Sequence, residues 1–349
     1  MNPEDVARAV ASGPKTRGGT TRPAAGAPPR QRPGQRPLPG GKGGRGSGKG
    51  PGRNGRGPRR ARLRDWLRGA RIRTLPMAIA PVLVGTGAAH LSDGFWHGRM
   101  ALLCLAIAVF MILGVNFAND YSDGVRGTDD VRTGPPRLTG GGLARPRTVL
   151  TVAMVFFGLA AAAGLLAVIL SGRWWLLVVG AAAIAAAWFY TGGRRPYGYI
   201  GLGELAVFLF FGLAGTVGTT YLQTANVPQE SWIGAVAVGC IAVATLVSNN
   251  IRDIPTDRAA GKRTLSVLIG ALWSRVLYIV LMLVPFAVLA LYSLFYFYAP
   301  YVFFTAFIAV PAMIIAATAR SAREWILVLG LTNLFALFYA LGLGIAFAF

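Results

Sequence analysis

Long apolar runs restrict the fold of this chain more than any other feature of its sequence. Most of them reach the roughly 17–25 residues that a transmembrane helix needs. Helices of this length satisfy their own backbone polar groups inside a bilayer. The runs therefore predict an all-α, polytopic membrane protein with nine transmembrane helices, the shortest at residues 174–190. The nine runs cover approximately residues 76–92, 100–120, 148–170, 174–190, 203–222, 232–249, 274–296, 300–318 and 325–348.

The composition excludes an ordinary soluble globular domain. Hydrophobic residues make up 54% of the chain and charged residues 14%, and the mean hydropathy is +0.51. The formal net charge of +22 is unevenly distributed. Residues 1–73 hold 19 of the 35 Lys and Arg but 3 of the 13 Asp and Glu. The basic character therefore belongs mainly to the N-terminal segment.

The chain divides at residue 61 into a basic tail and a membrane domain. Residues 1–61 are rich in Gly, Pro and Arg, and they contain too few apolar side chains to offset the cost of ordering. We expect this tail to be disordered and to lie against anionic lipid headgroups. Sequence-independent binding to a polyanion is the alternative, and no specific nucleic acid is expected. The membrane domain comprises residues 62–349.

The charges of the loops predict how the chain is oriented. Loops on one side of the predicted membrane carry 14 Lys and Arg, whereas loops on the other side carry Arg99 and Arg173. The positive-inside rule places the side richer in Lys and Arg, together with the N-terminus, in the cytoplasm and the C-terminus outside. We expect the membrane to be the plasma membrane. Residues 62–75 form a basic amphipathic stretch, which predicts an interfacial helix leading into the membrane.

Two acidic segments stand where apolar runs end. They are NFANDYSDGVRGTDD at residues 116–130 and NNIRDIPTDRAAGKRT at residues 249–264. Asp120 and Asp123 are spaced i,i+3, and Asp253 and Asp257 i,i+4, so each pair shares one helix face. Four runs separate the segments, which predicts that both emerge at the same membrane surface.

Carboxylate pairs at a membrane surface, close to Arg and Lys, suit a lipid diphosphate bridged by Mg²⁺. Carboxylates hold the metal while substrate phosphate oxygens complete its coordination. Arg and Lys contact the remaining phosphate oxygens. The neighbouring amides of Asn116, Asn119 and Asn250 are candidates for donating to phosphate or for orienting the carboxylates. Stabilising a departing diphosphate favours cleavage of an allylic C–O bond.

Four stretches together resemble the UbiA superfamily of intramembrane prenyltransferases, over about residues 70–349. They are the two acidic segments, GPPRLTGGGLARP after the first of them, and YTGGRRPYGYIGLGE at residues 190–204. Within the superfamily they are most similar to the branch that uses 1,4-dihydroxy-2-naphthoate. The resemblance implies nine helices around a central cavity, Mg²⁺ as cofactor and a polyprenyl diphosphate donor. The implied product is demethylmenaquinone, formed with decarboxylation during menaquinone biosynthesis.

The resemblance also implies roles for individual residues. Asp120, Asp123, Asp253 and Asp257 are the implied catalytic metal ligands, and Asn119 belongs to the first motif. The implied substrate-binding residues include the flanking basic and loop positions Arg252, Lys262, Tyr190 and Arg194. Charge alone makes Arg137 a candidate for the carboxylate of the acceptor. Asp129 and Asp130 suit a solvated loop equally well, and Glu204 is expected to cap a helix.

Two alternatives stay open at this stage. One is a family member with a different acceptor, such as 4-hydroxybenzoate. The other is a transporter or channel, which would place ionisable groups along a path through the membrane. The apolar runs are nearly free of charge at their centres. This distribution favours an enzyme with a surface site. Cys104 and Cys240 lie alone in apolar runs, which is typical of small core residues.

Overall fold

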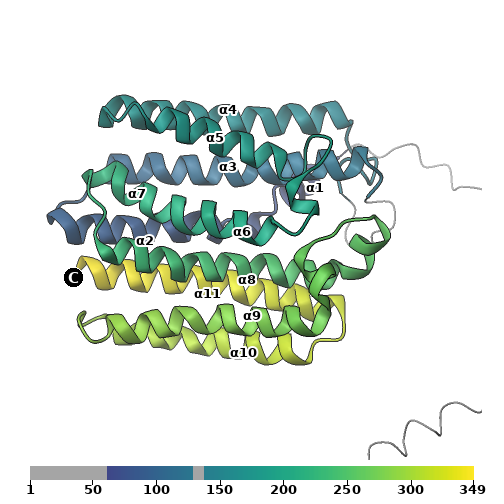
Figure 1. Ribbon diagram of the computed structural model, residues 1–349. Helices are drawn as coiled ribbons and strands as arrows, with labels where there is room; N and C mark the ends of the chain where they lie inside the picture. The colour runs from purple at the N-terminus through teal and green to yellow at the C-terminus, as the bar shows by residue number, and fades with distance from the viewer. Residues whose placement is uncertain (1–60, 129–136) are drawn as a thin grey trace, which may run out of the picture. The chain divides into compact units, whose positions relative to one another are not determined.

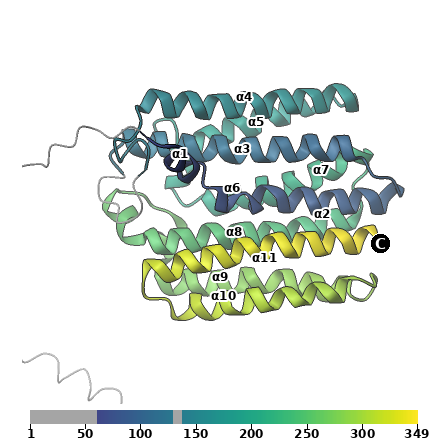
Figure 2. The same ribbon diagram turned by 180° about the vertical axis from the view of Figure 1, so that it is seen from behind.

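The computed structural model describes residues 61–128 and 137–349, which form an all-helical bundle (Figures 1 and 2). The tail at residues 1–60, almost all of the predicted N-terminal segment, lies outside the described residues, as do Asp129 and Asp130. The α-helices are α1 (Leu63–Gly69), α2 (Pro76–Asp93), α3 (Gly98–Val125), α4 (Pro146–Ser171), α5 (Leu176–Phe189), α6 (Gly203–Val207), α7 (Gly215–Thr224), α8 (Gln229–Ala259), α9 (Leu265–Tyr292), α10 (Ala306–Thr318) and α11 (Ala322–Ala348). The shorter helical elements are η1 (Ile72–Thr74), η2 (Tyr197–Tyr199), the π-helix η3 (Phe208–Ala214) and η4 (Ala299–Thr305).

Every predicted apolar run forms a helix, and the chain is a multi-pass membrane protein. Within the described ranges, seven helical segments are long and apolar enough to cross a membrane, and an eighth is α2 together with its lead-in. The predicted number of nine is not confirmed, because α5 has 14 residues. A span of the hydrocarbon core takes about 20 residues.

The amphipathic lead-in is broken rather than continuous. Helix α1 and η1 are separated at Arg71, whose φ of 51° is left-handed, and the lead-in meets α2 at an angle of 42°. Trp66 of α1 packs against Phe117 of α3, with ring centroids 5.9 Å apart. The lead-in therefore lies across the end of α3 instead of extending α2.

Small residues allow the central helices to approach closely. A Cβ added at Gly87 of α2 would stand 2.4 Å from the backbone oxygen of Gly344 in α11. A Cβ added at Gly212 of η3 would stand 2.6 Å from the Cα of Gly239 in α8. Such glycine contacts bring helix backbones together in membranes, where dispersion forces drive helix association.

Helix α8 is the centre of the bundle. In its most apolar window 78% of residues are buried, compared with 17–44% in the other spanning segments. It packs against α2, α9, α11 and η3. Because the second acidic segment lies at the C-terminal end of this helix, the most enclosed element of the fold positions it.

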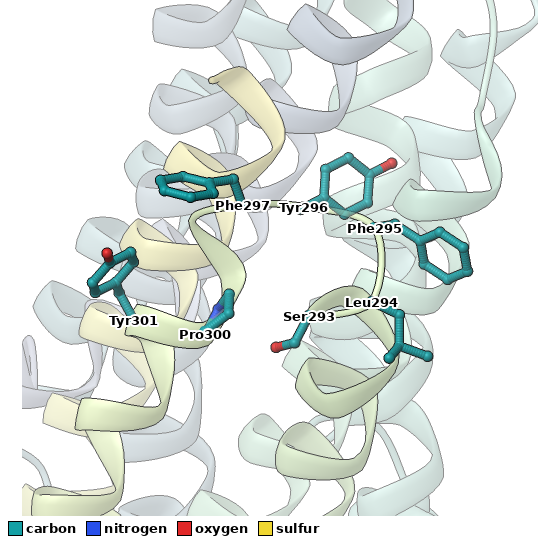
Figure 3. Close-up of a pocket in the computed structure, with 7 residues that line it drawn as sticks. All are labelled: Ser293, Leu294, Phe295, Tyr296, Phe297, Pro300 and Tyr301. Carbon is teal, nitrogen blue, oxygen red and sulfur yellow. The ribbon is translucent and has the colours of Figure 1, made fainter.

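The two ends of the bundle differ in chemistry. The C-terminal ends of α3 and α8 and the loop between α5 and α6 lie at one end, which we call the carboxylate end (Figure 1). Figure 3 shows an aromatic hollow at the turn between α9 and η4, lined by Ser293, Leu294, Phe295, Tyr296, Phe297, Pro300 and Tyr301. Tyr292 beside this turn donates to the backbone of Glu230, at the start of α8. The hollow is therefore at the end opposite to the carboxylates.

Candidate functional site

The two acidic segments meet through an ion pair. The ammonium of Lys262 lies 3.0 Å from Oδ1 of Asp123, across 139 positions of sequence. Asp123 ends α3, and Lys262 follows α8, so this contact places both helix ends at one surface. The prediction that the segments share a membrane face is confirmed.

Asp123 is the most connected side chain of the site. The residue is 4% exposed. Besides Lys262, its carboxylate accepts hydrogen bonds from the guanidinium of Arg137, at 2.8 Å, and from the hydroxyl of Tyr199. Two cations thus surround one buried anion, which offsets the cost of removing that anion from water. Burial, and then the negative charge of Asp123, raises the pKa of the Tyr199 phenol. The phenol therefore stays protonated and donates to the carboxylate at neutral pH.

Asp120 makes contacts that the prediction of a metal ligand did not include. Its carboxylate is buried, and its two oxygens accept the backbone N–H groups of Leu138 at 3.1 Å and Thr139 at 2.8 Å. These bonds fix the loop that carries Arg137. The i,i+3 spacing puts Asp120 near the face of Asp123, but the returning loop covers it. The metal-ligand role of Asp120 stays a prediction, and this geometry gives it a second role, because it holds the loop that carries Arg137.

An Asp120→Asn variant tests this positioning role. Asparagine has one acceptor oxygen, so one of the two buried N–H groups loses its partner, which costs about 1–3 kcal/mol. We expect a lower melting temperature and weaker turnover with an unchanged Mg²⁺ requirement. Metal titration of the activity is the decisive measurement. If Asp120 were a metal ligand, its replacement would raise the Mg²⁺ concentration that gives the half-maximal rate.

The second acidic segment contributes a partly buried ion pair and a hydrogen-bonded amide. Asp253 is held by the guanidinium of Arg252 through two bonds, of 2.8 and 2.7 Å. Asp257 lies one turn further along α8 and is half-buried. The amide of Asn250 donates to Oε1 of Glu204 at 2.8 Å. The expectation that Glu204 caps α6 is wrong, because its carboxylate contacts another helix and no side-chain cap is formed.

The asparagines of the first segment hold the site together. The amide of Asn116 donates to the backbone of Ala70 at 2.9 Å and to Thr74 at 3.3 Å, which ties the lead-in to α3. The amide oxygen of Asn119 accepts the hydroxyl of Thr191 at 2.6 Å. Both side chains are buried. These contacts give the two residues a structural role that the prediction of substrate binding did not include.

The loop between α5 and α6 packs over these residues. Tyr190 accepts the backbone N–H of Gly198 at 3.0 Å, and a Cβ at Gly198 would stand 2.6 Å from the same oxygen. Arg194 is exposed. The phenol of Tyr190 lies within electrostatic range of both Asp123 and Glu204. Tyr190 therefore lies near both carboxylates, whereas Arg194 is exposed to the surface.

Sequence reasoning missed two residues that complete the site, Tyr199 and Arg126. Tyr199 donates to Asp123, and Lys262 and Arg126 lie over its ring, 4.6 Å and 5.5 Å from the centroid. The guanidinium of Arg126 also donates to the backbone oxygens of Thr191 and Gly193, which holds the loop against α3. The motif at residues 190–204 contains Tyr199, but its spacing does not identify the partners of that side chain.

The donor set suits a metal that arrives with a diphosphate. Among the described residues, no three His, Cys, Asp or Glu side chains lie close enough together to hold a metal ion. Mg²⁺ is commonly held by one or two carboxylates plus substrate phosphates, so a complete protein cage is not required. Buried hydroxyls of Thr139 and Thr264 have no hydrogen-bond partner within the described part of the chain. Thr139 comes shortly after Arg137 in the sequence, and Thr264 shortly after Lys262, so both hydroxyls are available to a ligand of this site.

Comparisons with known proteins identify the family of this chain. The model of the UbiA prenyltransferase family matches residues 78–327. The 1,4-dihydroxy-2-naphthoate octaprenyltransferase of Mycobacterium tuberculosis is 50% identical over 218 residues, covering 61% of this chain and 73% of that protein. The Escherichia coli protein of the same name is 37% identical over 245 residues, covering 67% and 78%.

Solved structures share the fold. A UbiA homolog from Aeropyrum pernix K1 superposes with a TM-score of 0.59 at 19% identity, covering 78% of this chain and 96% of that one. A UbiA homolog from Archaeoglobus fulgidus, bound to GPP and Mg²⁺, has a TM-score of 0.55 at 14% identity, covering 81% and 99%. At this identity the likeness extends to the fold alone.

Proposed function

The chain belongs to the UbiA prenyltransferase family, and from this premise we propose that it transfers a polyprenyl group from an allylic diphosphate to 1,4-dihydroxy-2-naphthoate. The product, after loss of CO₂, is the quinol form of demethylmenaquinone, which a separate two-electron oxidation converts into the quinone of menaquinone biosynthesis. Relatives at 37–50% identity carry the name of this activity. The observation that carries the proposal within the molecule is the meeting of Asp123 and Lys262 at the carboxylate end.

The ion pairs of the site suggest how a diphosphate is bound. Lys262 and Arg137 lie against Asp123, and Arg252 lies against Asp253. When a metal diphosphate binds, the cations can turn to phosphate oxygens and leave the carboxylates to the metal. Asp123, Asp253 and Asp257 are the ligands that we propose. Mg²⁺, when bound, neutralises the diphosphate and thereby makes it a better leaving group.

The chain's own residues orient the donor and exclude competing reactions. Lys262 is fixed by the ring of Tyr199 as well as by Asp123, so its ammonium is directed before substrate arrives. Such preorganised charge stabilises developing negative charge without reorganisation in the transition state. The polyprenyl chain would extend into the central cavity that the sequence predicts, between the apolar helices.

The remaining features of the chain are proposed to serve attachment and orientation. Residues 62–349 form the catalytic domain, and the basic tail at residues 1–61 contacts anionic lipid headgroups. The carboxylate end faces the cytoplasm of a cell whose plasma membrane the helices span, and the C-terminus lies outside. The loop charges support this orientation, since most of them belong to the carboxylate end.

An assay with a panel of aromatic acceptors tests the function. Purified protein, Mg²⁺ and a polyprenyl diphosphate are incubated with 1,4-dihydroxy-2-naphthoate or with 4-hydroxybenzoate, and products are identified by mass. We expect a decarboxylated prenyl product from the naphthoate. Turnover of 4-hydroxybenzoate without any turnover of the naphthoate would replace the proposed acceptor while retaining the reaction class.

A further inference from the structure

Glu204 is a buried carboxylate that the binding of diphosphate does not use. It is 6% exposed and lies in the first turn of α6, where the sequence predicts a cap. Its described hydrogen-bond partner is the neutral amide of Asn250, 2.8 Å away. Asp123 and Asp253 are instead paired with cations. Glu204 thus carries charge that no cation of the described chain offsets.

The position of Glu204 relates it to the reacting centre. Its partner Asn250 lies on α8 three residues before Asp253, which is about one helical turn. The phenol of Tyr190 is within electrostatic range of Glu204 and of Asp123. A Cβ at Gly203, next to Glu204, would stand 3.2 Å from the hydroxyl of Tyr190. Glu204 and Asp123 therefore both lie near the phenol of Tyr190, at the carboxylate end.

The backbone after Glu204 is unusual for a spanning helix. Helix α6 has five residues and passes directly into the π-helix η3. π-Helical turns widen a helix locally and occur often at functional sites. Gly212 of η3 lies against Gly239 of α8, so the helix that carries Glu204 and the helix that carries Asn250 pack closely further along their length.

The proposed reaction needs a group that accepts a proton. A phenolic ring attacks an allylic carbon much better when its hydroxyl is deprotonated. Acids paired with Arg or Lys are poor proton acceptors, because the cation favours the ionised carboxylate. Asp120 is also unsuitable, since backbone N–H groups occupy both of its oxygens. Glu204, whose described partner is a neutral amide, is a carboxylate able to take a proton.

We propose that Glu204 is the general base that removes the proton from the acceptor's ring hydroxyl, and this proposal rests on the proposed function. The proton moves to the Glu204 carboxylate as the ring carbon that bears the carboxylate forms a bond to the prenyl carbon. The C–O bond breaks at the same centre, and diphosphate departs with the electron pair. The resulting β-keto acid loses CO₂, which leaves an enolate. Protonated Glu204 returns its proton to the enolate oxygen, so the Glu204 carboxylate is ionised again at the end of the reaction.

Glu204→Gln is the variant that tests this role. Glutamine keeps the side-chain volume and an oxygen that faces Asn250, but it cannot take a proton. A general base contributes about 10²–10⁴-fold to rate, so we expect single-turnover prenyl transfer to fall at least about 100-fold. Binding of the polyprenyl diphosphate with Mg²⁺ should change by less than about threefold, because Glu204 does not contact diphosphate in our proposal.

The acidity of the acceptor separates a base from a merely structural residue. The assay compares 1,4-dihydroxy-2-naphthoate with a ring-halogenated analogue whose hydroxyl is more acidic. An acceptor that ionises more easily depends less on a base, so the deficit of Glu204→Gln should shrink by about tenfold. An equal deficit with both acceptors would contradict the proposal. So would a rate within about threefold of the unaltered protein, or a simultaneous loss of diphosphate binding.

Two controls complete the experiment. Glu230→Gln alters a carboxylate at the opposite end, where Tyr296 donates to it, and it should leave turnover unchanged. Glu204→Asp keeps a base but withdraws it by one methylene, so its rate should depend more steeply on acceptor acidity than that of the unaltered protein. If the rates of Glu204→Asp and of the unaltered protein depended equally on acceptor acidity, the proposed role of Glu204 would be overturned, even if Glu204→Gln fails to fold. Turnover by the unaltered protein tests the proposed function separately, since any phenolic acceptor that it uses can serve in the comparison.

Discussion

Asp123→Asn is expected to lose prenyl transfer almost completely, by at least about a thousandfold in kcat. Asparagine keeps the shape of the side chain but removes the charge that pairs with Arg137 and Lys262. Fixed charges aimed at a reacting centre are typically worth about 10²–10³-fold each. Asp123 acts twice, because it is a proposed metal ligand and also directs Lys262. The measurement is single-turnover product formation at saturating Mg²⁺.

The same substitution should also weaken the fold. Removing one partner of a buried ion pair leaves the other charges uncompensated, which costs about 3–5 kcal/mol. Asp123→Glu separates the two effects, since it keeps the negative charge but shifts its oxygens by one methylene. We expect Asp123→Glu to melt close to the unaltered protein and still to lose about 100-fold in rate. Full activity in Asp123→Glu would show that the position of these oxygens is unimportant, contrary to our account.

Asp253→Asn should give the second-largest loss, about 100-fold or more in kcat, together with a higher Mg²⁺ requirement. The side chain of Asp253 is 27% exposed and paired with the neighbouring Arg252. A partly exposed pair contributes about 1 kcal/mol or less to stability. The melting temperature should therefore change little while the metal titration shifts. This combination distinguishes a metal ligand from a structural carboxylate.

A matched aspartate at the opposite end serves as the control for Asp253. Asp93 forms a hydrogen bond of 2.7 Å with His97, at the end of α2 remote from the site. Asp93→Asn should leave both kcat and the Mg²⁺ requirement unaltered. A similar loss in both variants would mean that general surface charge, rather than a local site, supports the activity.

The parity of the helices was predictable from sequence, whereas the partners of each side chain were not. Counting apolar runs placed residues 116–130 and 249–264 at one surface, because each helix reverses the chain direction. The ion pair between Asp123 and Lys262 agrees with that count. Helical spacing alone could not separate Asp120 from Asp123. The two carboxylates differ because the backbone N–H groups of Leu138 and Thr139, which follow a loop, donate hydrogen bonds to Asp120.

Other differences arise from backbone features that apolar patterns do not reveal. The apolar run at 274–296 predicted a later start for the helix that begins at Leu265, and Gly270 interrupts it with a φ of 79°. The span that follows Glu204 contains a π-helix, although its composition is that of an ordinary transmembrane segment. Long-range packing sets these features, so the sequence predicted the direction of the helices better than their geometry.

The central claim is that residues from both acidic segments hold one metal diphosphate. It can be tested by electron paramagnetic resonance of Mn²⁺, in place of Mg²⁺, with a non-hydrolysable polyprenyl diphosphate analogue. The account predicts a bound Mn²⁺ with phosphorus hyperfine coupling in the unaltered protein, and loss of that signal in both Asp123→Asn and Asp253→Asn. An unchanged Mn²⁺–phosphorus signal in either variant would contradict a shared site.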